Sequence, residues 1–290
     1  MAGPTLWQGL KFHELTQVMR QSDTQFSSVL TKIGSGELLN ENEISLIESR
    51  FFSKSDANAL CPNGIRLFLT NNAVTQYNNS VLQNSENKVI SIAQDAITGS
   101  QNAEQLAFLR QKLHKLSTIE TGGLPYEIVF VLHKPYIITT NIDVTDGLAN
   151  GAVGDLVHLE YDNDHNLIRA WLEFPTSPKV GQGLRKKSAA HATNRNISLL
   201  AVPINLRTSC TSLNNNRTIF AKRKHFPLIA ACAMTIHKSQ GGTFNEVVYE
   251  YEKQHCQQLV YVALSRVTSL GGIYIVNPQD NTKFYHGRKR

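Results

Sequence analysis

The sequence of 290 residues lacks the features that mark membrane, secreted and zinc-binding proteins. No run reaches the roughly 18 apolar residues that a membrane span needs. The opening MAGPTLWQGLKFHEL has neither a basic region nor a continuous apolar stretch, so a secretory leader is not expected. The four cysteines lie far apart with no C-x-x-C pair, which argues against a disulfide framework or a zinc site. We therefore expect an intracellular protein in a reducing compartment, with no membrane contact and no bound structural metal.

Charge of one sign is in only modest excess. The chain has 29 Lys and Arg against 23 Asp and Glu, which gives a net charge of +6 and a pI near 9.1. A basic balance is compatible with nucleic-acid binding, because neutralisation of phosphates drives non-specific affinity. Many basic proteins bind no nucleic acid, so the composition permits this function without establishing it.

The spacing of apolar residues predicts α/β structure at both ends of the chain. Helical periodicity runs from 22 to 33, and a second helix is expected from Asn40, with Glu43 completing a capping box. Residues 65–69 read as a short strand that turns into a helix through 74–81, the order that a parallel sheet requires. From Phe226 the same texture returns, with a buried strand, a polar loop, a further strand, a helix and a last strand.

Between these ends the texture changes to short alternating or apolar runs. EIVFVL, YIITT, DLVHLEY, IRAWLEF and SLLAVPINL are separated by turn residues, which is typical of a small antiparallel barrel or meander. Residues 175–197 are polar and basic, and we expect a mobile loop there. Tyr161, Trp171 and Phe174 have two interpretations, stacking on bases or filling the barrel, and the barrel core is favoured. The sequence thus predicts an α/β domain interrupted by a β-module.

Four segments carry a resemblance to a known family. They are FHELTQVMRQSDTQF (12–26), RLFLTNNAVTQYN (66–78), AMTIHKSQGGTF (233–244) and QLVYVALSRVTSLGGIYIV (258–276). Together and in this order they resemble the later motifs of superfamily 1 DNA helicases of the RecD/Pif class, especially the Helitron-type helicases. The third segment is similar to motif V, the fourth to motif VI and the first to motif IV. The resemblance covers nearly the whole chain and corresponds to the C-terminal half of such a helicase.

The resemblance implies a fold and its boundaries. The expected fold is α/β: a RecA-like parallel-sheet domain interrupted by a small SH3-like β-barrel insertion. The second motor domain would occupy 1–147 and 226–290, and the insertion 148–225.

The same resemblance assigns two arginines to the γ-phosphate of ATP. Arg266 lies in ALSR, after a helix whose apolar face can dock on the sheet, and Arg20 lies in MRQ. A guanidinium in a desolvated cleft can neutralise the charge that develops during phosphoryl transfer. For either arginine the alternative is an ordinary surface salt bridge.

Other polar residues of the motifs are implied to bind nucleotide or DNA. Gln240 and Gly241 are expected near the nucleotide, and Gly242 replaces a bulkier apolar residue, so the loop is expected to be looser than usual. For Asn72 and Asn78 the alternative is a helix cap and an exposed helix polar residue. The residues expected to approach single-stranded DNA are Thr235, His237, Ser239, Asn72 and Asn78.

The sequence contains no P-loop of the form G-x-x-x-x-G-K-[ST]. ATP and Mg²⁺ would therefore be shared with a first RecA-like domain that these residues do not include, and a helicase half in trans is one expected partner. Alone, the chain is expected not to hydrolyse ATP. The favoured function is the C-terminal motor half of an ATP-dependent, 5′-to-3′ DNA helicase in repair, recombination or transposon mobility, with a nuclear location. The alternatives are a non-catalytic remnant that binds single strands and an interaction scaffold without a nucleic-acid role.

Overall fold

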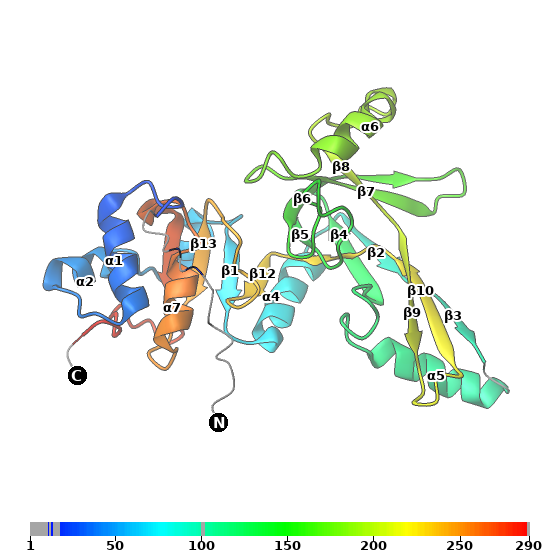
Figure 1. Cartoon of the computed structure of the whole chain (residues 1–290), viewed down its shortest axis with the longest axis horizontal. Coiled ribbons are helices and arrows are strands. Elements are labelled where there is room, and N and C mark those ends of the chain that lie inside the picture. Colours follow the sequence, from blue (N-terminus) through cyan, green and yellow to red (C-terminus); the bar gives the residue numbers. More distant parts are fainter. Residues whose placement is uncertain (1–10, 12, 14–17, 100–101, 289–290) are drawn as a thin grey trace.

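The computed structural model describes residues 11, 13, 18–99 and 102–288. Figure 1 shows two regions side by side: a parallel sheet with its helices, and a group of antiparallel sheets that extends away from it. Five residues of the first motif segment, 12 and 14–17, lie outside the described residues. Within the described ranges, no helix is long and apolar enough to cross a membrane.

The first region, here called the parallel-sheet lobe, contains one four-stranded sheet. Its strands are β12 (Ala233–Thr235), β1 (Ile65–Phe68), β13 (Val247–Glu250) and β14 (Ile273–Val276), in that order and all parallel. The helices of the lobe are α1 (Thr24–Ser35), α2 (Glu41–Glu48), α3 (Lys54–Leu60), α4 (Asn71–Gln83) and α7 (Gln257–Leu264). The predicted mixed α/β fold with a parallel sheet is confirmed.

Local sequence signals fix the helices of the lobe. The Asp23 carboxylate caps α1 by accepting from the amides of residues 25 and 26, and Gly36 ends the helix in the left-handed conformation with φ 81°. The predicted capping box is present, because the Asn40 and Glu43 side chains each accept from the other's backbone amide. The buried face of α1 is the predicted one: Phe26, Val29, Leu30 and Ile33.

A single apolar cluster joins the sheet to the helices that cover it. Leu67 of β1, Val247 of β13 and Ile275 of β14 are fully buried in this cluster together with residues of α1 and α7. Burial of each such side chain contributes roughly 1.5–3 kcal/mol. The side-chain amide of Gln257 donates to the Ile33 carbonyl at 2.7 Å, which connects the start of α7 to α1.

The second region, here called the β-module, contains three antiparallel sheets. Its helices are α5 (Ala103–Lys115) and α6 (Gln182–Asn194). The sheet orders are β11-β5-β6-β7-β8, β3-β10-β9 and β2-β4. The strands are β2 (Lys88–Ile92), β3 (Gln94–Thr98), β4 (Glu127–Val131), β5 (Pro135–Ile138), β6 (Val153–Tyr161), β7 (Leu167–Glu173), β8 (Val202–Asn205), β9 (Arg207–Ser212), β10 (Phe220–His225) and β11 (Leu228–Ala230).

The strand pairing differs in two respects from the sequence-based outline. β4 and β5 pair antiparallel as their runs predict, although they precede the predicted insertion 148–225. β2 and β3 also join antiparallel sheets, so this pairing begins near residue 88, before the predicted runs, and it ends near 230. The expected loop at 175–197 instead contains helix α6. Trp171 and Phe174 are buried as favoured, whereas Tyr161 remains 37% exposed at the end of β6.

Candidate functional site

The loop that follows β12 lies at the carboxyl edge of the parallel sheet, where ligands of open α/β sheets bind. Thr235 pairs with Phe68 across the two strands, and the amide of Ile236 donates to the Phe68 carbonyl at 3.0 Å. The first turn of α4, with the exposed Asn72, begins three residues after Phe68. The two motif segments, 66–78 and 233–244, therefore meet at one edge of the sheet.

Within this loop some of the expected site residues point inward and others outward. Thr235 is buried, and its hydroxyl oxygen accepts from the Lys238 amide at 3.3 Å. Ser239 is fully buried and donates to the Ile236 carbonyl at 2.7 Å, so its hydroxyl braces the turn. His237, Lys238 and Gln240 are the exposed polar side chains of the turn.

The loop is closely packed at Gly242. A Cβ there would lie 3.0 Å from the Phe244 ring and 3.1 Å from the Ser239 carbonyl oxygen. The Gly242 amide donates to that carbonyl at 2.9 Å. The looseness expected from a glycine at this position is therefore absent, because the smaller residue allows a tight backbone approach. Gly241 beside it has φ 86° and nothing within 4 Å of an added Cβ, so it faces open space.

Arg266 holds the end of α7 against this loop. The side chain is 5% exposed and all three of its guanidinium nitrogens donate hydrogen bonds. Nε donates to the Val262 carbonyl at 2.7 Å, and Nη2 to the Ser265 hydroxyl at 2.7 Å. Nη1 donates to the carbonyls of Ser239 and Gly242 at 3.2 and 3.1 Å. The arginine thus links the segment after α7 directly to the loop after β12.

Arg20 reaches the same place from the other end of the chain. Its Nε donates to the Thr243 hydroxyl and its Nη1 to the Ser265 carbonyl, both at 3.0 Å. The side-chain amide of Gln21 donates to the carbonyls of Ser265 and Val267 at 3.2 and 3.0 Å. The short segment from Arg20 therefore runs along the residues that follow α7, although about 245 positions separate them in sequence.

Two cations therefore lie close together at this edge. Burial, and then the neighbouring charge of Arg20, lower the pKa of Arg266 to about 10. That value still leaves Arg266 charged at neutral pH. Two guanidinium groups in one partly buried place repel each other, and an anion with several oxygen atoms would relieve that repulsion by charge-assisted hydrogen bonds. The predicted pair Arg20 and Arg266 is brought together.

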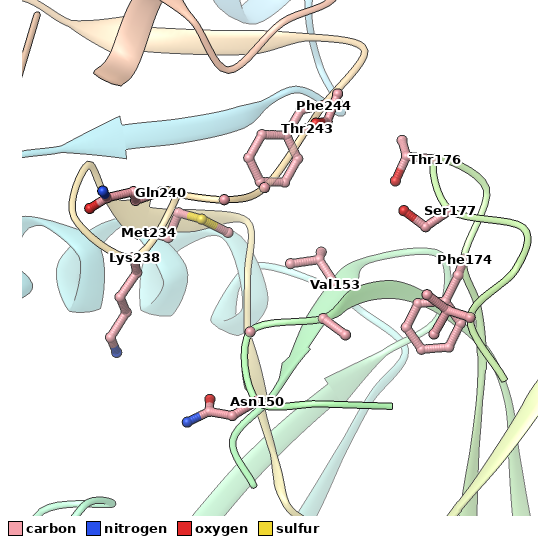
Figure 2. A pocket seen from close by; sticks show the side chains of 15 residues that line it. Asn150, Val153, Phe174, Thr176, Ser177, Met234, Lys238, Gln240, Thr243 and Phe244 are labelled. Atoms are coloured by element: carbon pink, nitrogen blue, oxygen red, sulfur yellow. The ribbon is translucent and has the colours of Figure 1, made fainter. Parts of the chain in front are cut away.

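A groove of about 370 Å³ separates the loop from the β-module. Figure 2 shows Thr243 and Phe244 on one wall and Phe174, Thr176 and Ser177 on the other. The remaining lining residues are Asn150, Gly151, Ala152, Val153, Val180, Met234, Lys238, Gln240, Gly241 and Gly242.

A larger groove of about 620 Å³ lies between α4, β12 and the β-module. Thr235 and Asn78 line it, together with Asn71, Thr75 and Asn79 of α4. Met234 and Lys238 line both grooves, so the Lys238 side chain stands where the two meet. Lys238 is therefore an exposed cation that lines both grooves at this edge of the sheet.

Asn78 and Asn72 are placed differently. Asn78 is buried, and its amide group donates to the Ala230 and Ala233 carbonyls at 3.3 and 3.2 Å and accepts from the Ala233 amide at 2.8 Å. It thus shapes the groove by holding β12 to α4. Asn72 is exposed on the first turn of α4 and lines neither groove.

Lys238 and Thr243 are site residues that the sequence reasoning did not single out. Lys238 had a detectable signal, since it is the only cation in the HKSQGG turn after a buried strand. Thr243 had none, because its hydroxyl matters only through Arg20, which is distant in sequence. In the part of the chain that the structure describes, no group of three or more His, Cys, Asp or Glu residues could hold a metal ion.

Several known proteins are similar to this chain over most of its length. No protein-family model matches the chain. The ATP-dependent DNA helicase PIF1 of Danio rerio is 25% identical over 272 residues, which cover 91% of this chain and 35% of that relative. The crystal structure of Pif1 helicase from Candida albicans aligns with a TM-score of 0.61 and 22% identity, over 93% of this chain and 57% of that one.

A second solved structure shares the same fold. Pif1 helicase from Bacteroides, in complex with ADP-AlF3 and single-stranded DNA, aligns with a TM-score of 0.57 and 20% identity, over 96% of this chain and 54% of that one. The chain thus spans about a third of the zebrafish relative and about half of the solved chains. Along nearly its whole length the chain is Pif1-like, and the resemblance to superfamily 1 helicases that its motifs predict is confirmed.

Proposed function

We propose that the chain is the second motor domain of an ATP-dependent DNA helicase, which supplies two arginines to a nucleotide and a polar loop to single-stranded DNA. The observation that carries this proposal is the meeting of Arg20 and Arg266 on the loop after β12. A parallel sheet with two cations at its carboxyl edge suits the terminal phosphate of a nucleotide that another domain holds. The 5′-to-3′ polarity and the nuclear location remain proposals that rest on the resemblance alone.

The arginines would act in different ways. Arg266 is anchored by carbonyls of the loop, so its charge is fixed in position before any ligand arrives. Arg20 is half-buried and anchored through Nε and Nη1, which leaves Nη2 to meet an anionic oxygen. The nucleotide, with Mg²⁺, would supply the phosphoanhydride bond that is hydrolysed. Gln240 and Gly241 are proposed to lie at the nucleotide side of the loop.

The DNA contacts would follow the two grooves. His237 and Lys238 are exposed beside them, and Thr235 and Asn78 line the larger one. Ser239 is buried and would act through the loop backbone. Asn72, exposed at the same edge, would contact the strand as it leaves the grooves. Since Arg266 holds carbonyls of this same loop, the proposed phosphate contact and the proposed DNA contacts would share one rigid element.

The β-module would form the opposite wall of the DNA path. We propose that residues 148–225 of the module form the SH3-like insertion, and that β2 to β5, α5 and β11 belong with the motor-domain segments 1–147 and 226–290. The first groove supports this role, because residues 150–153, 174, 176 and 177 of the module line it opposite the loop. No relative or solved structure supports a separate chain as the source of the first motor domain.

The DNA part of the proposal is tested by fluorescence anisotropy with a labelled oligothymidylate at several salt concentrations. We expect salt-sensitive binding, with the slope of log K against log salt reduced by about 0.7 for each phosphate contact removed. His237→Ala with Lys238→Gln should weaken binding about tenfold. Lys253→Gln with Lys283→Gln, which removes two exposed charges beside Tyr285, is the matched control. Binding that ignores both salt and the loop variant would contradict the proposal.

The nucleotide part is tested by thermal unfolding with and without ATP and by single-strand-stimulated ATP hydrolysis. We expect a small ATP-dependent rise in Tm that Arg20→Gln removes, and no turnover above background. The alternative, a single-strand-binding remnant, is favoured only by the lack of a P-loop in these residues. It predicts the DNA result without the ATP effect. Turnover that Arg266→Ala abolishes would mean that the chain holds a complete nucleotide site, which would contradict the half-motor proposal.

A further inference from the structure

A part of the β-module extends away from both grooves. It consists of β3, α5, β9 and β10, here called the arm, with residues 94–116 and 207–225. Figure 1 shows it at the far end of the module from the parallel sheet. The three strands form their own sheet with β10 in the centre, and α5 packs on one face through the cluster of Leu109, Leu113, Leu213, Ile219 and Ala221.

A buried ion pair holds the arm rigid. Arg223 of β10 is 2% exposed and makes two parallel bonds to Asp95 of β3, from Nε at 2.8 Å and Nη2 at 2.7 Å. The same guanidinium donates to the carbonyls of Leu113 and Leu124 at 3.5 and 3.3 Å. The sheet, the helix and the turn before β4 are thereby fixed together, so a ligand would meet a preformed surface.

The other face of the arm sheet is open. Along β10 the side chains alternate, and Phe220, Lys222 and Lys224 are exposed while Ala221, Arg223 and His225 are buried. Cross-strand register places short polar or small side chains beside the exposed three, and none of these neighbours is acidic. The neighbours are Thr98, Ala96 and Gln94 on β3 and Ser212, Cys210 and Thr208 on β9. The two lysines and the Phe220 ring therefore project from a surface of short, uncharged side chains.

The arm also holds the basic excess of the chain. Its two segments contain eight Lys and Arg and two acidic residues, a net charge of +6, which equals the net charge of all 290 residues. The rest of the chain is therefore balanced. One of the two acids, Asp95, is already paired with Arg223. Among the ion pairs of the described residues, none involves Lys222 or Lys224.

We infer that this open face, defined by Phe220, Lys222 and Lys224, is a second binding site for single-stranded DNA. The lysines, about 7 Å apart along the strand, would neutralise successive phosphates, and the ring of Phe220 (40% exposed) would stack on an unpaired base. Stacking favours a single strand, because the bases of a duplex do not present their faces. The choice of ligand rests on the proposed function, but the site is separate from the loop after β12.

The first test compares a short oligonucleotide of about 8 nucleotides, which fills one site, with one of about 30, which can reach both. Two linked sites give an avidity that neither gives alone, so the long strand should bind at least tenfold more tightly. Lys222→Gln with Lys224→Gln should remove that advantage and lower the salt slope by about 1.4 for the long strand. Phe220→Leu, which keeps an apolar side chain without a ring face, should weaken the long strand about tenfold.

This experiment distinguishes an absent arm site from absent DNA contacts at the loop after β12. If the arm variants bind the long strand like the unmodified chain while His237→Ala with Lys238→Gln weakens it, the arm inference is overturned and the proposed function stands. If only the arm variants weaken binding, the arm site stands and the loop contacts fail. Tighter binding of a duplex than of the long single strand would also overturn the inference. Lys253→Gln with Lys283→Gln again controls for loss of two charges.

Cys210 allows a test that does not depend on any binding variant. Cys210 and Cys256 are exposed, whereas Cys61 and Cys232 are buried. A photo-crosslinker attached to Cys210 in a Cys256→Ser chain lies beside Lys222 on the open face and should capture the long single strand. The same reagent on Cys256 in a Cys210→Ser chain lies at the start of α7, the end of that helix away from the loop after β12, and should capture little. Equal capture from both positions would overturn the inference.

Discussion

The parallel-sheet lobe and the β-module are stabilised by different kinds of contact. In the lobe, one large apolar cluster joins residues from Phe26 to Phe284, and its strands are buried on both faces. In the module the apolar clusters are smaller, and ion pairs with a buried member lie between elements: Glu160 beneath α6 and Arg223 beneath α5. The buried arginines of the lobe, Arg66 and Arg266, instead donate to uncharged oxygens. Apolar packing is non-directional, whereas a bidentate ion pair fixes orientation. The module therefore gains precise geometry from groups that cost much if left unpaired.

The proposed nucleotide and DNA contacts depend on these two kinds of stabilisation. The arginines proposed for the nucleotide lie in the lobe, where the loop after β12 is braced by backbone bonds and packing. The surfaces proposed for DNA in the module are set by polar contacts that salt, pH or substitution can disturb. Variants that break one kind of contact should therefore leave the other region folded.

The largest effect is expected from Arg223→Met in the arm. The substitution leaves the Asp95 carboxylate, only 10% exposed, without its partner, and an uncompensated buried charge costs about 3–5 kcal/mol. Hydrogen exchange should show loss of protection in 94–124 and 207–225, with the parallel sheet still protected. Arg223→Met with Asp95→Leu should recover much of the stability, since an apolar pair leaves no buried charge. A loss below about 1 kcal/mol in the single variant would contradict a buried, desolvated pair.

Leu67→Ala should produce the second largest effect, and in the opposite region. Leu67 is fully buried in the central strand of the parallel sheet, and the cavity left by its truncation costs about 3 kcal/mol. Urea unfolding should show a lower midpoint, and exchange should increase in β1, β12 and β13 while the arm stays protected. Leu69→Ala, at a position 42% exposed just beyond the strand, is the control and should change stability little. Equal exchange in both regions would mean that they unfold as one unit.

Sequence reasoning was accurate where the signal was local. The face of α1, the capping box at Asn40 and the strand before α4 depend on residues a few positions apart, and all are present. The pairing of Arg20 with Arg266 followed only from the resemblance, since no local pattern joins residues about 245 positions apart. Their role at a nucleotide stays a prediction.

Helix α6 shows why some elements could not be predicted from the sequence. It has no continuous apolar face, and Gly181 at its start provides no side-chain cap. The cap comes instead from Asp146, whose carboxylate accepts from the Gly183 and Leu184 amides at 2.8 and 2.9 Å. A cap from 37 positions away leaves no mark in the local sequence, so the segment read as a loop. The early start of the antiparallel pairing near 88 was missed for the same reason, because β2 pairs with the distant β4.

Glu160→Gln should have a smaller effect, confined to the contact of β6 with β7 and α6. The Glu160 carboxylate is 3% exposed and accepts from Trp171 Nε1 at 3.0 Å, Arg169 at 2.7 Å and His191 at 2.8 Å. Burial raises its pKa, but these three donors outweigh burial and hold the pKa below the usual 4.5. The stabilisation is thus present above pH 4.5 and is lost as pH falls through the lower, folded-state pKa.

The variant keeps the shape but loses the charge, so about 2 kcal/mol of stability should disappear at pH 7. Acid unfolding followed by tryptophan fluorescence should report it, since Trp171 is fully buried beside the carboxylate. The variant should show less loss of stability on acidification than the unmodified chain. Glu173→Gln, on the neighbouring strand β7 and with no hydrogen-bond partner of this kind among the described residues, is the control. An unchanged acid profile in Glu160→Gln would contradict the assignment.

The smallest expected effects come from one histidine in each region, His225 buried in the module and His286 partly buried in the lobe. His225 of the module donates from Nδ1 to the Pro125 carbonyl at 2.8 Å, so its Nε2 must accept from Ser91 at 3.0 Å. His286 of the lobe donates from Nε2 to the His255 carbonyl at 2.7 Å, so its Nδ1 accepts from Tyr251 at 2.8 Å. Protonation would break the second bond in each case, and burial lowers both pKa values below 6.5.

Because the folded pKa is depressed, each histidine stabilises the fold fully above pH 6.5, and that stabilisation falls as pH drops through 6.5 toward the folded value. Between pH 7 and pH 5 we therefore expect each histidine to lower the free energy of unfolding. His225→Gln should reduce the pH dependence of exchange in the arm alone, and His286→Gln that of the parallel sheet alone. Each variant thus serves as the other's control. If either one flattened the pH profile of both regions, the two would share one cooperative unit, and the separation between apolar lobe and polar module would fail.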